Sequence, residues 1–505
     1  MSALNITQHD SSSSPTSLTI SLALLHVFIV FVIQRFIRKR YRKILPPGPR
    51  GLPLLGNIYD IPQTAPWVTY RDLTAKYGDV IAIRLLGHPV IVLNSLAAVN
   101  DLLEKRSAIY SDRPAPVVSI SRTSVLIPCY TGSGASDSSH TTTTGAAPVA
   151  SSGNTFNLCL LRDQRNLQEL IQLTLLNMGY GLPASDVTSH YADLLSDMDS
   201  GVSEAYHPTI FYIPWLRYLP RWLPGGTWKS GVQKWRLQAD SIREAPFMAA
   251  MKLMAIEPSV LTELFGKLQS GETPGLDQEF VKAILGAIFT AGADTTSGSL
   301  FAFFCAMIIY PEVQKRAHEE LDAVVGPDRL PEHSDRPSLP YISAIIKEVL
   351  RWHNLVPLGM SHRCMEDNEY RGWVIPEDAT ILANIWAILH DPEHFPEPDE
   401  FRPERFLKDG QLDPDAFDPV TLGFGSGRRI CPGRHFAEDA LFINIASVLH
   451  VFDILPAVDE CGKPIPVEYT ATSGLLSSVT PFQYSIRSRT SIAEGLVQEA
   501  LGEEE

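Results

Sequence analysis

A single cysteine stands in a glycine-rich segment near the C-terminal end, with the sequence FGSGRRICPG at residues 424–433. Gly425 and Gly433 allow the backbone to form a tight turn there. Amide groups in such a turn can point at the sulfur of Cys431 and favour its thiolate form. The segment therefore suits a metal-bound thiolate, and the alternative is a buried structural cysteine, the usual role of an unpaired one.

Two neighbours of this cysteine suit a flat ring that carries iron. Phe424 can stack against the underside of the ring, and Arg429 can reach a carboxylate on its rim. A long apolar helix is expected to follow at 434–448. A thiolate on haem iron pushes electron density toward the metal and favours cleavage of the O–O bond. The segment predicts a haem site with Cys431 as the proximal ligand.

The pattern Phe-x-x-Gly-x-Arg-x-Cys-x-Gly resembles the haem-binding signature of the cytochrome P-450 superfamily. The resemblance implies a mainly α fold with a small β-rich lobe, preceded by an N-terminal transmembrane helix. It implies a haem b cofactor and an NADPH-dependent monooxygenase, which inserts one oxygen atom of O₂ into a hydrophobic small molecule. Electrons would come from NADPH through NADPH–cytochrome P-450 reductase. The second half resembles fungal microsomal members of secondary metabolism, such as those like O-methylsterigmatocystin oxidoreductase, and xenobiotic oxidation is a related expectation.

A second motif, AGADTT at residues 291–296, lies inside a predicted helix at 276–307. Asp and Thr are unusual in mid-helix because both side chains compete for backbone hydrogen bonds. The resemblance implies that Thr295 hydrogen-bonds dioxygen and that Asp294 helps to relay protons from water. The alternative is a helix kinked at Gly292, with a threonine bonded back to its own helix.

A third pair of motifs predicts a buried ionic cluster. Glu348 and Arg351 lie at i and i+3 on a predicted helix at 341–352, so they share one face. Downstream stands FRPERF at residues 401–406. By the resemblance, Glu348, Arg351 and Arg405 form a network whose role is structural and which supports the loop around Cys431.

Further residues are expected around the ring on the strength of the resemblance. His362 would donate a hydrogen bond to a haem propionate beside Arg429, although a lone histidine is more often structural. Arg113 is a third candidate for the propionates. Apolar or small residues at 356–358 and 473–476, with those beside Phe303, would face the haem, which favours a hydrophobic substrate.

Composition sets outer limits on the function. The chain has 505 residues, 45% of them hydrophobic, so it can bury a large core. Its six cysteines lack paired spacing, which favours a reducing compartment without disulfides or a zinc site. A net charge of −15 argues against nucleic-acid binding. Arg428 and Arg434 can still form a local basic patch, at which the resemblance implies that an acidic electron donor docks.

The N-terminal end predicts a single-span membrane anchor. An apolar run of about one bilayer length is followed by a dense cluster of Arg and Lys, which places the rest of the chain in the cytoplasm. The endoplasmic reticulum membrane is the expected location, and Asn5 is a potential glycosylation acceptor on the other side. The predicted parts are a lumenal tail at 1–17, the anchor at 18–37, a basic and proline-rich hinge at 38–56, the catalytic domain at 57–490 and an acidic tail at 491–505. Near the start of the catalytic domain, residues 67–77 read as helical, and 80–86 and 90–93 read as strands.

An anomalous segment at 117–160 breaks this pattern. Residues 131–154 are nearly all Ser, Thr, Gly and Ala, a composition that cannot bury enough apolar surface to offset its ordering entropy. The family usually places a Trp-x-x-x-Arg helix here, which holds a haem propionate, and none is visible. The segment is either a mis-spliced or mistranslated insert or a genuine disordered loop. The anomalous segment leaves open a catalytically defective relative. A haem-thiolate isomerase or dehydratase that uses no dioxygen stays open as a separate alternative, against which the retained Asp294 and Thr295 argue.

Overall fold

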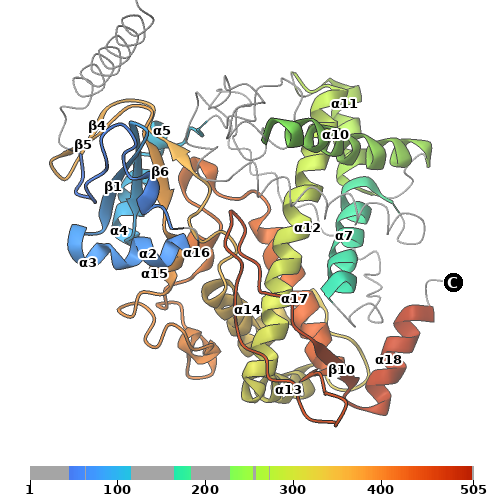
Figure 1. Ribbon diagram of the computed structural model, residues 1–505. Coiled ribbons are helices and arrows are strands. Elements are labelled where there is room, and N and C mark those ends of the chain that lie inside the picture. Colours follow the sequence, from blue (N-terminus) through green and yellow to red (C-terminus); the bar gives the residue numbers. More distant parts are fainter. Residues whose placement is uncertain are drawn as a thin grey trace, which may run out of the picture.

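The computed structural model describes residues 45–62, 64–114, 164–182, 228–253, 258–271, 273 and 275–502. The expected anchor, Asn5 and the anomalous segment lie outside these residues. The described part has a small β-rich lobe and a larger helical lobe beside it (Figure 1). This arrangement confirms the mainly α fold with a small β lobe that the sequence predicts.

The small lobe is built on a four-stranded sheet in the order β1-β2-β6-β3. Its strands are β1 (Val80–Leu85), β2 (His88–Leu93), β3 (His362–Arg363) and β6 (Thr380–Ala383). The β2 strand runs parallel to β6, with Val90 opposite Thr380, whereas the other neighbours are antiparallel. Ile81 and Ile83 pack with Tyr70 on one face, and Val80 and Ala82 pack with the core on the other. Because both faces are buried, these strands read as continuous apolar runs.

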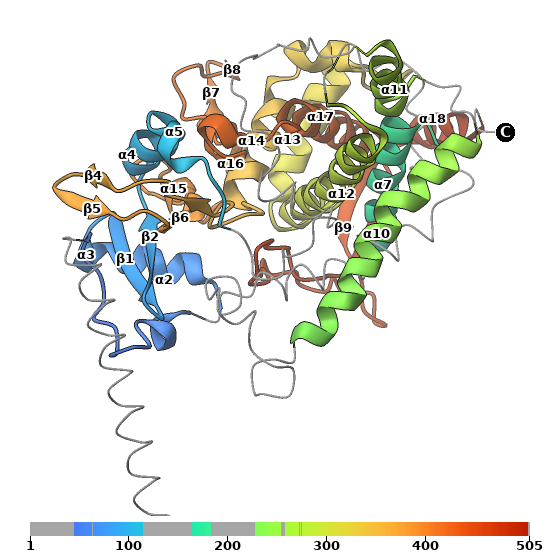
Figure 2. The same cartoon turned by 90° about the horizontal axis from the view of Figure 1, so that it is seen from above.

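The larger lobe consists of long helices around a central one. They are α7 (Gln164–Tyr180), α10 (Trp228–Lys252), α11 (Val260–Ser270), α12 (Gln278–Ile309), α13 (Pro311–Val324), α14 (Pro340–Trp352), α17 (Arg434–Val451) and α18 (Ser491–Gly502). The α12 helix crosses the lobe and contacts α7, α10, α11, α13, α14 and α17 (Figure 2). Asp277 caps its N-terminus by accepting a hydrogen bond from the Phe280 amide at 2.7 Å. The predicted helices at 276–307, 341–352 and 434–448 are thus confirmed within a few residues.

Among the described residues, α12 alone is long and apolar enough to meet the length and hydropathy criteria for a membrane span. However, 67% of its most apolar window is buried inside the protein. Phe301, Phe303 and Phe304 belong to the main hydrophobic core. The helix therefore serves as the central core helix of the larger lobe.

Shorter elements connect the two lobes and the site. The helical ones are η1 (Ile58–Asp60), α2 (Pro66–Asp72), α3 (Thr74–Tyr77), α4 (Leu96–Val99), the π-helix η2 (Asn100–Glu104), α5 (Ser107–Tyr110), η6 (His333–Ser338), α15 (Ile385–Leu389), η7 (Pro403–Phe406), α16 (Val420–Gly423) and η8 (Gly427–Arg429). The remaining strands are β4 (Asn368–Tyr370), β5 (Trp373–Ile375), β7 (Leu407–Lys408), β8 (Gln411–Leu412), β9 (Phe452–Pro456) and β10 (Tyr484–Ser488). Each of these strands pairs antiparallel with one other, as β4–β5, β7–β8 and β9–β10.

The C-terminal end differs from the acidic tail expected from residue 491. Residues 491–502 form α18, which packs on α17. Ala493 and Val497 lie four residues apart, so they share one helix face, and both are buried in the main core. Glu494 and Glu499 are exposed, as expected for the acidic residues. Within 491–502 only these two residues are acidic, and the apolar positions at helical spacing supply the buried face.

Candidate active site

The loop around Cys431 lies between η8 and α17. Its thiol is free and partly buried, and the Cys431 amide closes the loop by donating to the Phe424 carbonyl at 2.8 Å. Burial raises the pKa of the Cys431 thiol, while the Gly433 amide and the charge of Arg434 oppose that rise. The protein alone therefore does not hold this sulfur as the thiolate. A metal ion would, because a coordinating thiol is deprotonated outright.

Two glycines of this loop adopt left-handed backbone conformations. Gly425 has φ +84° and Gly427 has φ +59°. A β-carbon on Gly427 would lie 2.3 Å from the Leu103 carbonyl oxygen, too close for any side chain. The Gly427 amide also donates to Glu104 Oε2 at 2.5 Å. The loop thus rests on η2 and α5, and Glu104 holds it from 323 residues away.

We expect Gly427→Ala to displace this loop. A left-handed alanine costs about 1–2 kcal/mol, and the clash with the Leu103 carbonyl adds about 1–3 kcal/mol of overpacking strain. Gly410→Ala is the matched control, because Gly410 has φ +77° with nothing within 4 Å of its added β-carbon. Urea unfolding should show the smaller loss for Gly410→Ala. Equal losses in the two variants would contradict the close packing of the loop on η2.

A cluster of basic side chains lies around the C-terminal end of α5 and the residues just after it. Tyr110 offers its carbonyl oxygen to His362 Nδ1 at 2.6 Å, and the Ser111 carbonyl accepts from Arg429 Nε at 2.6 Å. Arg113 Nη1 donates to the Met360 and Ser361 carbonyls at 2.6 and 2.8 Å. The fold therefore brings together His362, Arg113 and Arg429, the three residues expected near propionates.

The protonation of His362 limits what it can do. Burial lowers its pKa to about 3, and the charges of Arg113 and Arg429 add to that effect. Because a carbonyl only accepts, the Nδ1 that faces Tyr110 carries the proton, and Nε2 of the neutral ring is an acceptor. The predicted donation to a propionate therefore requires the imidazolium form, which a neighbouring carboxylate would favour. Arg113 and Arg429 each carry several N–H donors and no acceptor.

One face of α12 is accessible in mid-helix. Ala291 is exposed, and Asp294, Thr295 and Gly298 are partly exposed, whereas residues 299–307 are all buried. Thr295 Oγ1 donates to the Ala291 carbonyl at 2.7 Å, the back-bonded arrangement that the sequence left open. The hydroxyl oxygen keeps two lone pairs, so it can still accept a hydrogen bond from a ligand. Asp294 and Thr295 thus stand where a molecule beside α12 can reach them.

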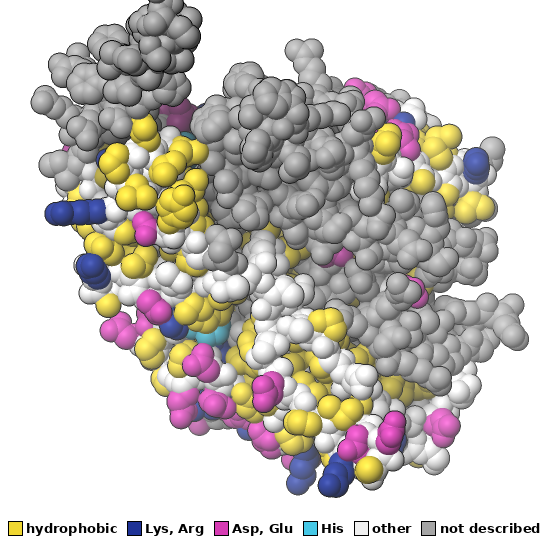
Figure 3. Space-filling model, in the orientation of Figure 1, with side chains coloured by type: hydrophobic (Ala, Val, Ile, Leu, Met, Phe, Trp, Pro, Cys, Tyr) yellow, Lys and Arg dark blue, Asp and Glu magenta, His cyan; other side chains and the backbone are white. Residues whose placement is uncertain are grey.

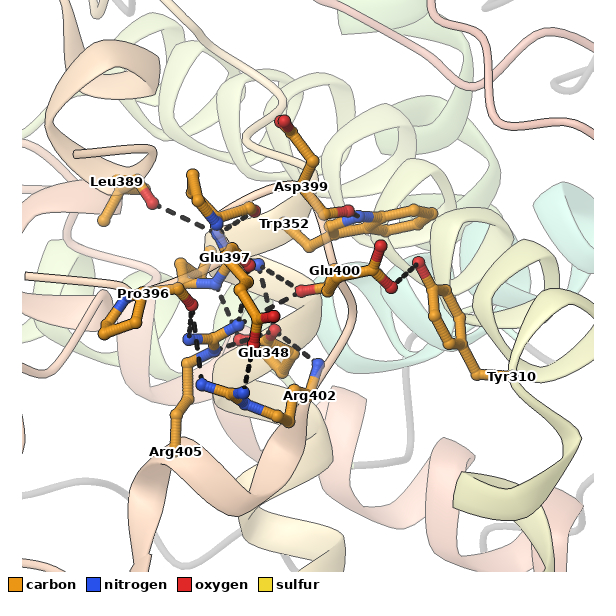
Figure 4. A network of polar contacts seen from close by, with 12 residues as sticks. Tyr310, Glu348, Trp352, Leu389, Pro396, Glu397, Asp399, Glu400, Arg402 and Arg405 are labelled. Carbon is orange, nitrogen blue, oxygen red and sulfur yellow. Dashed lines mark hydrogen bonds and ion pairs between the residues drawn. The ribbon is translucent and has the colours of Figure 1, made fainter. Parts of the chain in front are cut away.

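The predicted ionic cluster is assembled at the end of α14 (Figure 4). Glu348 and Arg351 are 0% exposed and Arg405 is 5% exposed at the side chain. Glu348 accepts from Arg351 Nε at 2.7 Å, Arg351 Nη2 at 2.9 Å, Arg405 Nε at 3.1 Å and the Arg402 amide at 2.7 Å. Arg351 also donates to the carbonyls of Leu389, Pro398 and Glu400. Burial lowers the pKa of Arg405, and the charge of Arg351 adds to this while Glu348 opposes it.

The helix that carries this cluster also reaches the cysteine loop. α14 packs on α17, which begins three residues after Cys431, and on α16, which ends just before Phe424. Lys347 forms an ion pair with Asp418, whose other oxygen accepts from the Val420 amide at 3.0 Å. The network is therefore linked through α14 to both ends of the loop.

Acid should weaken this support through His390. Its Nδ1 lies 2.9 Å from the Trp386 carbonyl, and burial followed by the charge of Arg351 lowers its pKa from 6.5 to about 3. Below pH 6.5 the imidazole of His390 becomes protonated in the unfolded chain, whereas it stays neutral in the folded protein. Stability should therefore fall as the pH drops, by up to about 1.4 kcal/mol per pH unit for this group. Thermal unfolding between pH 7.5 and 5 should show a shallower slope in His390→Gln, and an equal slope would contradict the assignment.

The residues present fit a haem. Cys431 offers one sulfur ligand at the start of α17, as a ring-bound iron with a single protein ligand on that side would need. The neighbouring cationic donors suit the carboxylates on such a ring. Phe424 is partly buried at the start of the loop. Gly433 is the N-cap of α17, and a β-carbon added to it would lie 3.8 Å from the Cys431 sulfur. Glu104 and the two carbonyls of residues 110 and 111 are the contacts that sequence reasoning missed.

Comparison with known proteins places the chain in a family. The model of the family described as cytochrome P450 matches residues 46–125 and 164–485. Cytochrome P450 monooxygenase ple1 of Rhodocybe pseudopiperita is 36% identical over 91% of this chain and 92% of its own length. Cytochrome P450 monooxygenase 208 of Postia placenta is 35% identical over 94% and 96%, and claR of Ampulloclitocybe clavipes is 33% identical over 96% and 94%. The matched residues end at 125 and resume at 164. This gap lies almost entirely within the anomalous segment at 117–160. The mostly helical fold, the small sheets and the glycine-rich loop around Cys431 agree with this match. The chain belongs to the cytochrome P450 family, and its similar relatives are fungal monooxygenases.

Proposed function

We propose that this protein is a haem-thiolate monooxygenase that inserts one oxygen atom of O₂ into a hydrophobic small molecule. The observation that carries the proposal is the pairing of the Cys431 loop with the basic cluster of His362, Arg113 and Arg429. A thiolate donor and carboxylate-binding groups are what a thiolate-ligated haem requires of the protein that holds it. The fungal relatives named as monooxygenases support the same reaction class.

Each residue has a separate task in holding the cofactor. Cys431 would ligate the iron, Phe424 would cover the ring below, and Arg429 and Arg113 would bind its propionates. When bound, a thiolate-ligated haem supplies the activation of dioxygen. The network of Glu348, Arg351 and Arg405 would have a structural role, which is to support the loop that carries Cys431.

Asp294 and Thr295 would relay protons from water to the bound oxygen on the accessible face of α12. The Thr295 hydroxyl is oriented by its bond to the Ala291 carbonyl, and its oxygen stays able to accept a hydrogen bond from a ligand. The carboxylate of Asp294, one residue away and partly exposed, can exchange protons with water. Neighbouring apolar residues of the helix favour an apolar substrate.

Electron supply and location form part of the same proposal. Electrons would come from NADPH through the cytochrome P-450 reductase, docking beside the exposed Arg428 and the 72% exposed side chain of Lys105. We propose that residues 18–37 anchor the chain in the endoplasmic reticulum membrane. Hydrophobic side chains gather on the small lobe in Figure 3, and the exposed large ones of that lobe include Leu52, Leu54 and Tyr59. Secondary metabolism or xenobiotic oxidation is the proposed setting.

The test is the absorption spectrum of the purified, dithionite-reduced chain under carbon monoxide. A thiolate-ligated haem shifts its main band strongly to the red. NADPH-dependent oxygen uptake with added reductase and a panel of apolar compounds then tests the reaction. The shifted band without oxygen uptake would favour an isomerase or dehydratase instead.

A second candidate is a catalytically defective relative. The break in the family match between residues 125 and 164 favours it, because a haem-contacting helix is expected there. An absent red-shifted band would support this candidate. Comparing the transcript with the gene across 117–160 would then distinguish a splicing or translation error from a genuine loop.

A further inference from the structure

The short segment at 110–113 supports the whole basic cluster. The Tyr110 carbonyl accepts from His362 Nδ1 at 2.6 Å. The Ser111 carbonyl accepts from Arg429 Nε at the same distance, 2.6 Å. Arg113 is itself part of the segment. The position of these few residues therefore decides where the side chains of the cluster stand.

Arg363 holds this segment through Asp112 in two ways. The Arg363 amide donates to the Asp112 carbonyl at 2.7 Å, and the two residues form an isolated antiparallel bridge. The guanidinium of Arg363 donates from Nε to Asp112 Oδ2 at 2.6 Å, and its Nη2 contacts the same oxygen. Asp112 follows Ser111 and precedes Arg113 in the chain, so a fixed Asp112 restrains the residues on both of its sides.

A second carboxylate ties Arg363 to the sheet of the small lobe. Arg363 Nη1 donates to Asp378 Oδ1 at 2.9 Å. The Asp378 amide in turn donates to the Cys364 carbonyl at 2.8 Å, and Arg363 lies opposite Thr380 where β3 pairs with β6. One side chain thus connects the segment that follows α5 to the four-stranded sheet.

The register of β3 separates Arg363 from the cluster that it supports. Successive residues of a strand point to opposite faces. His362 is 6% exposed, whereas the Arg363 side chain is 40% exposed. Because Asp112 and Asp378 occupy every guanidinium nitrogen of Arg363, this arginine is not a further donor for a haem carboxylate. Its effect on that site passes through the segment that it holds.

We propose that Arg363 is a positioning residue for the carboxylate-binding cluster, and that it acts by holding Asp112. With Asp112 held, the segment after α5 keeps its carbonyls in contact with the cluster. The inference rests on the proposed function, because it concerns the groups that would bind the haem propionates.

The test measures how fast the purified, haem-loaded full chain loses its haem to an excess of apomyoglobin. In Arg363→Gln the rate should rise about tenfold, because the partners that orient ligand-binding groups typically have effects of this size. Asp112→Asn should give a similar rise. The double variant should lose haem no faster than Arg363→Gln, because both changes remove the same contact.

Arg371→Gln is the matched control on the same lobe. Arg371 pairs with Asp79 at 2.9 Å, and the two side chains are 38% and 29% exposed. Those of Arg363 and Asp112 are 40% and 27% exposed, so the two ion pairs meet similar solvent. Urea unfolding should show similar changes in Arg371→Gln and Arg363→Gln, whereas haem loss in Arg371→Gln should stay at the wild-type rate.

Iron protoporphyrin IX dimethyl ester distinguishes positioning from a general loosening of the fold. Both carboxylates of this ligand are blocked, so Arg363→Gln reconstituted with it should lose the ligand as fast as the wild-type chain does. A tenfold difference that persists with the ester would overturn the proposal. Equal rates of haem loss in Arg363→Gln and Arg371→Gln would overturn it as well.

Should Arg363→Gln fail to fold, Asp112→Asn decides by the same comparison. The proposed function has a separate failure. A missing red-shifted band in the wild-type chain under carbon monoxide would count against the haem-thiolate assignment, whereas an unchanged rate in the variants of a chain that shows the band counts against Arg363 alone.

Discussion

Replacement of Cys431 by serine should abolish the red-shifted band of the reduced, carbon monoxide-bound protein and all monooxygenase activity with it. Serine is nearly the same size, so the loop can keep its bond from residue 431 to the Phe424 carbonyl at 2.8 Å. A serine hydroxyl has no thiolate character, so the electron donation that favours O–O cleavage is lost. The change therefore removes the chemistry while leaving the loop largely in place.

The matched control is Cys461→Ser, because Cys461 is a free, exposed cysteine in a surface turn. It should keep the band and the activity. Unfolding curves for both variants should lie close to that of the wild type, which shows that any spectral change is local. A Cys431→Ser protein that keeps its pigment, band and oxidising activity would eliminate the haem-thiolate assignment.

Glu348→Gln should destabilise the protein by about 3–5 kcal/mol, the cost of leaving a buried charge without its partner. Arg351 and Arg405 both depend on this carboxylate, and Arg351 is 0% exposed, so water cannot replace it. The amide is of similar size and can keep one acceptor oxygen. The expected loss therefore reports the charge rather than the packing.

Glu263→Gln on α11 provides the comparison. Glu263 pairs with Lys267 at 2.5 Å, but its side chain is 53% exposed, so the change should cost about 0.2–1 kcal/mol. Urea unfolding measures both, and haem content should fall in Glu348→Gln alone. If Glu348→Gln proved as stable as Glu263→Gln, the buried network would contribute nothing to the stability of the loop around Cys431.

The central features were predictable because short-range patterns encode them. The helix at α12 follows from its apolar run, and the cysteine loop follows from glycines that only particular turns require. Glu348 and Arg351 could be paired because i and i+3 positions share a helix face. Their joining with Arg405 came from the resemblance, and the structure then brought the three together.

What escaped prediction depends on contacts between distant residues. Glu104 holds the Gly427 amide across 323 positions, and nothing in the residues around either one indicates the other. The tautomer of His362 is set by the Tyr110 carbonyl, and backbone carbonyls carry no sequence signal. Helix α18 escaped because Ala493 and Val497 are buried only through packing on the distant helix α17.

The parallel pairing of β2 with β6 has a consequence for synthesis on the ribosome. Val90 emerges roughly 290 residues before its partner Thr380. At about 5–20 residues per second, the nascent chain would wait about 15–60 seconds with the outer edge of its first hairpin unpaired. An open, apolar strand edge is prone to wrong pairing during that interval. Chaperone supply during translation should therefore govern the yield of this protein in a heterologous host.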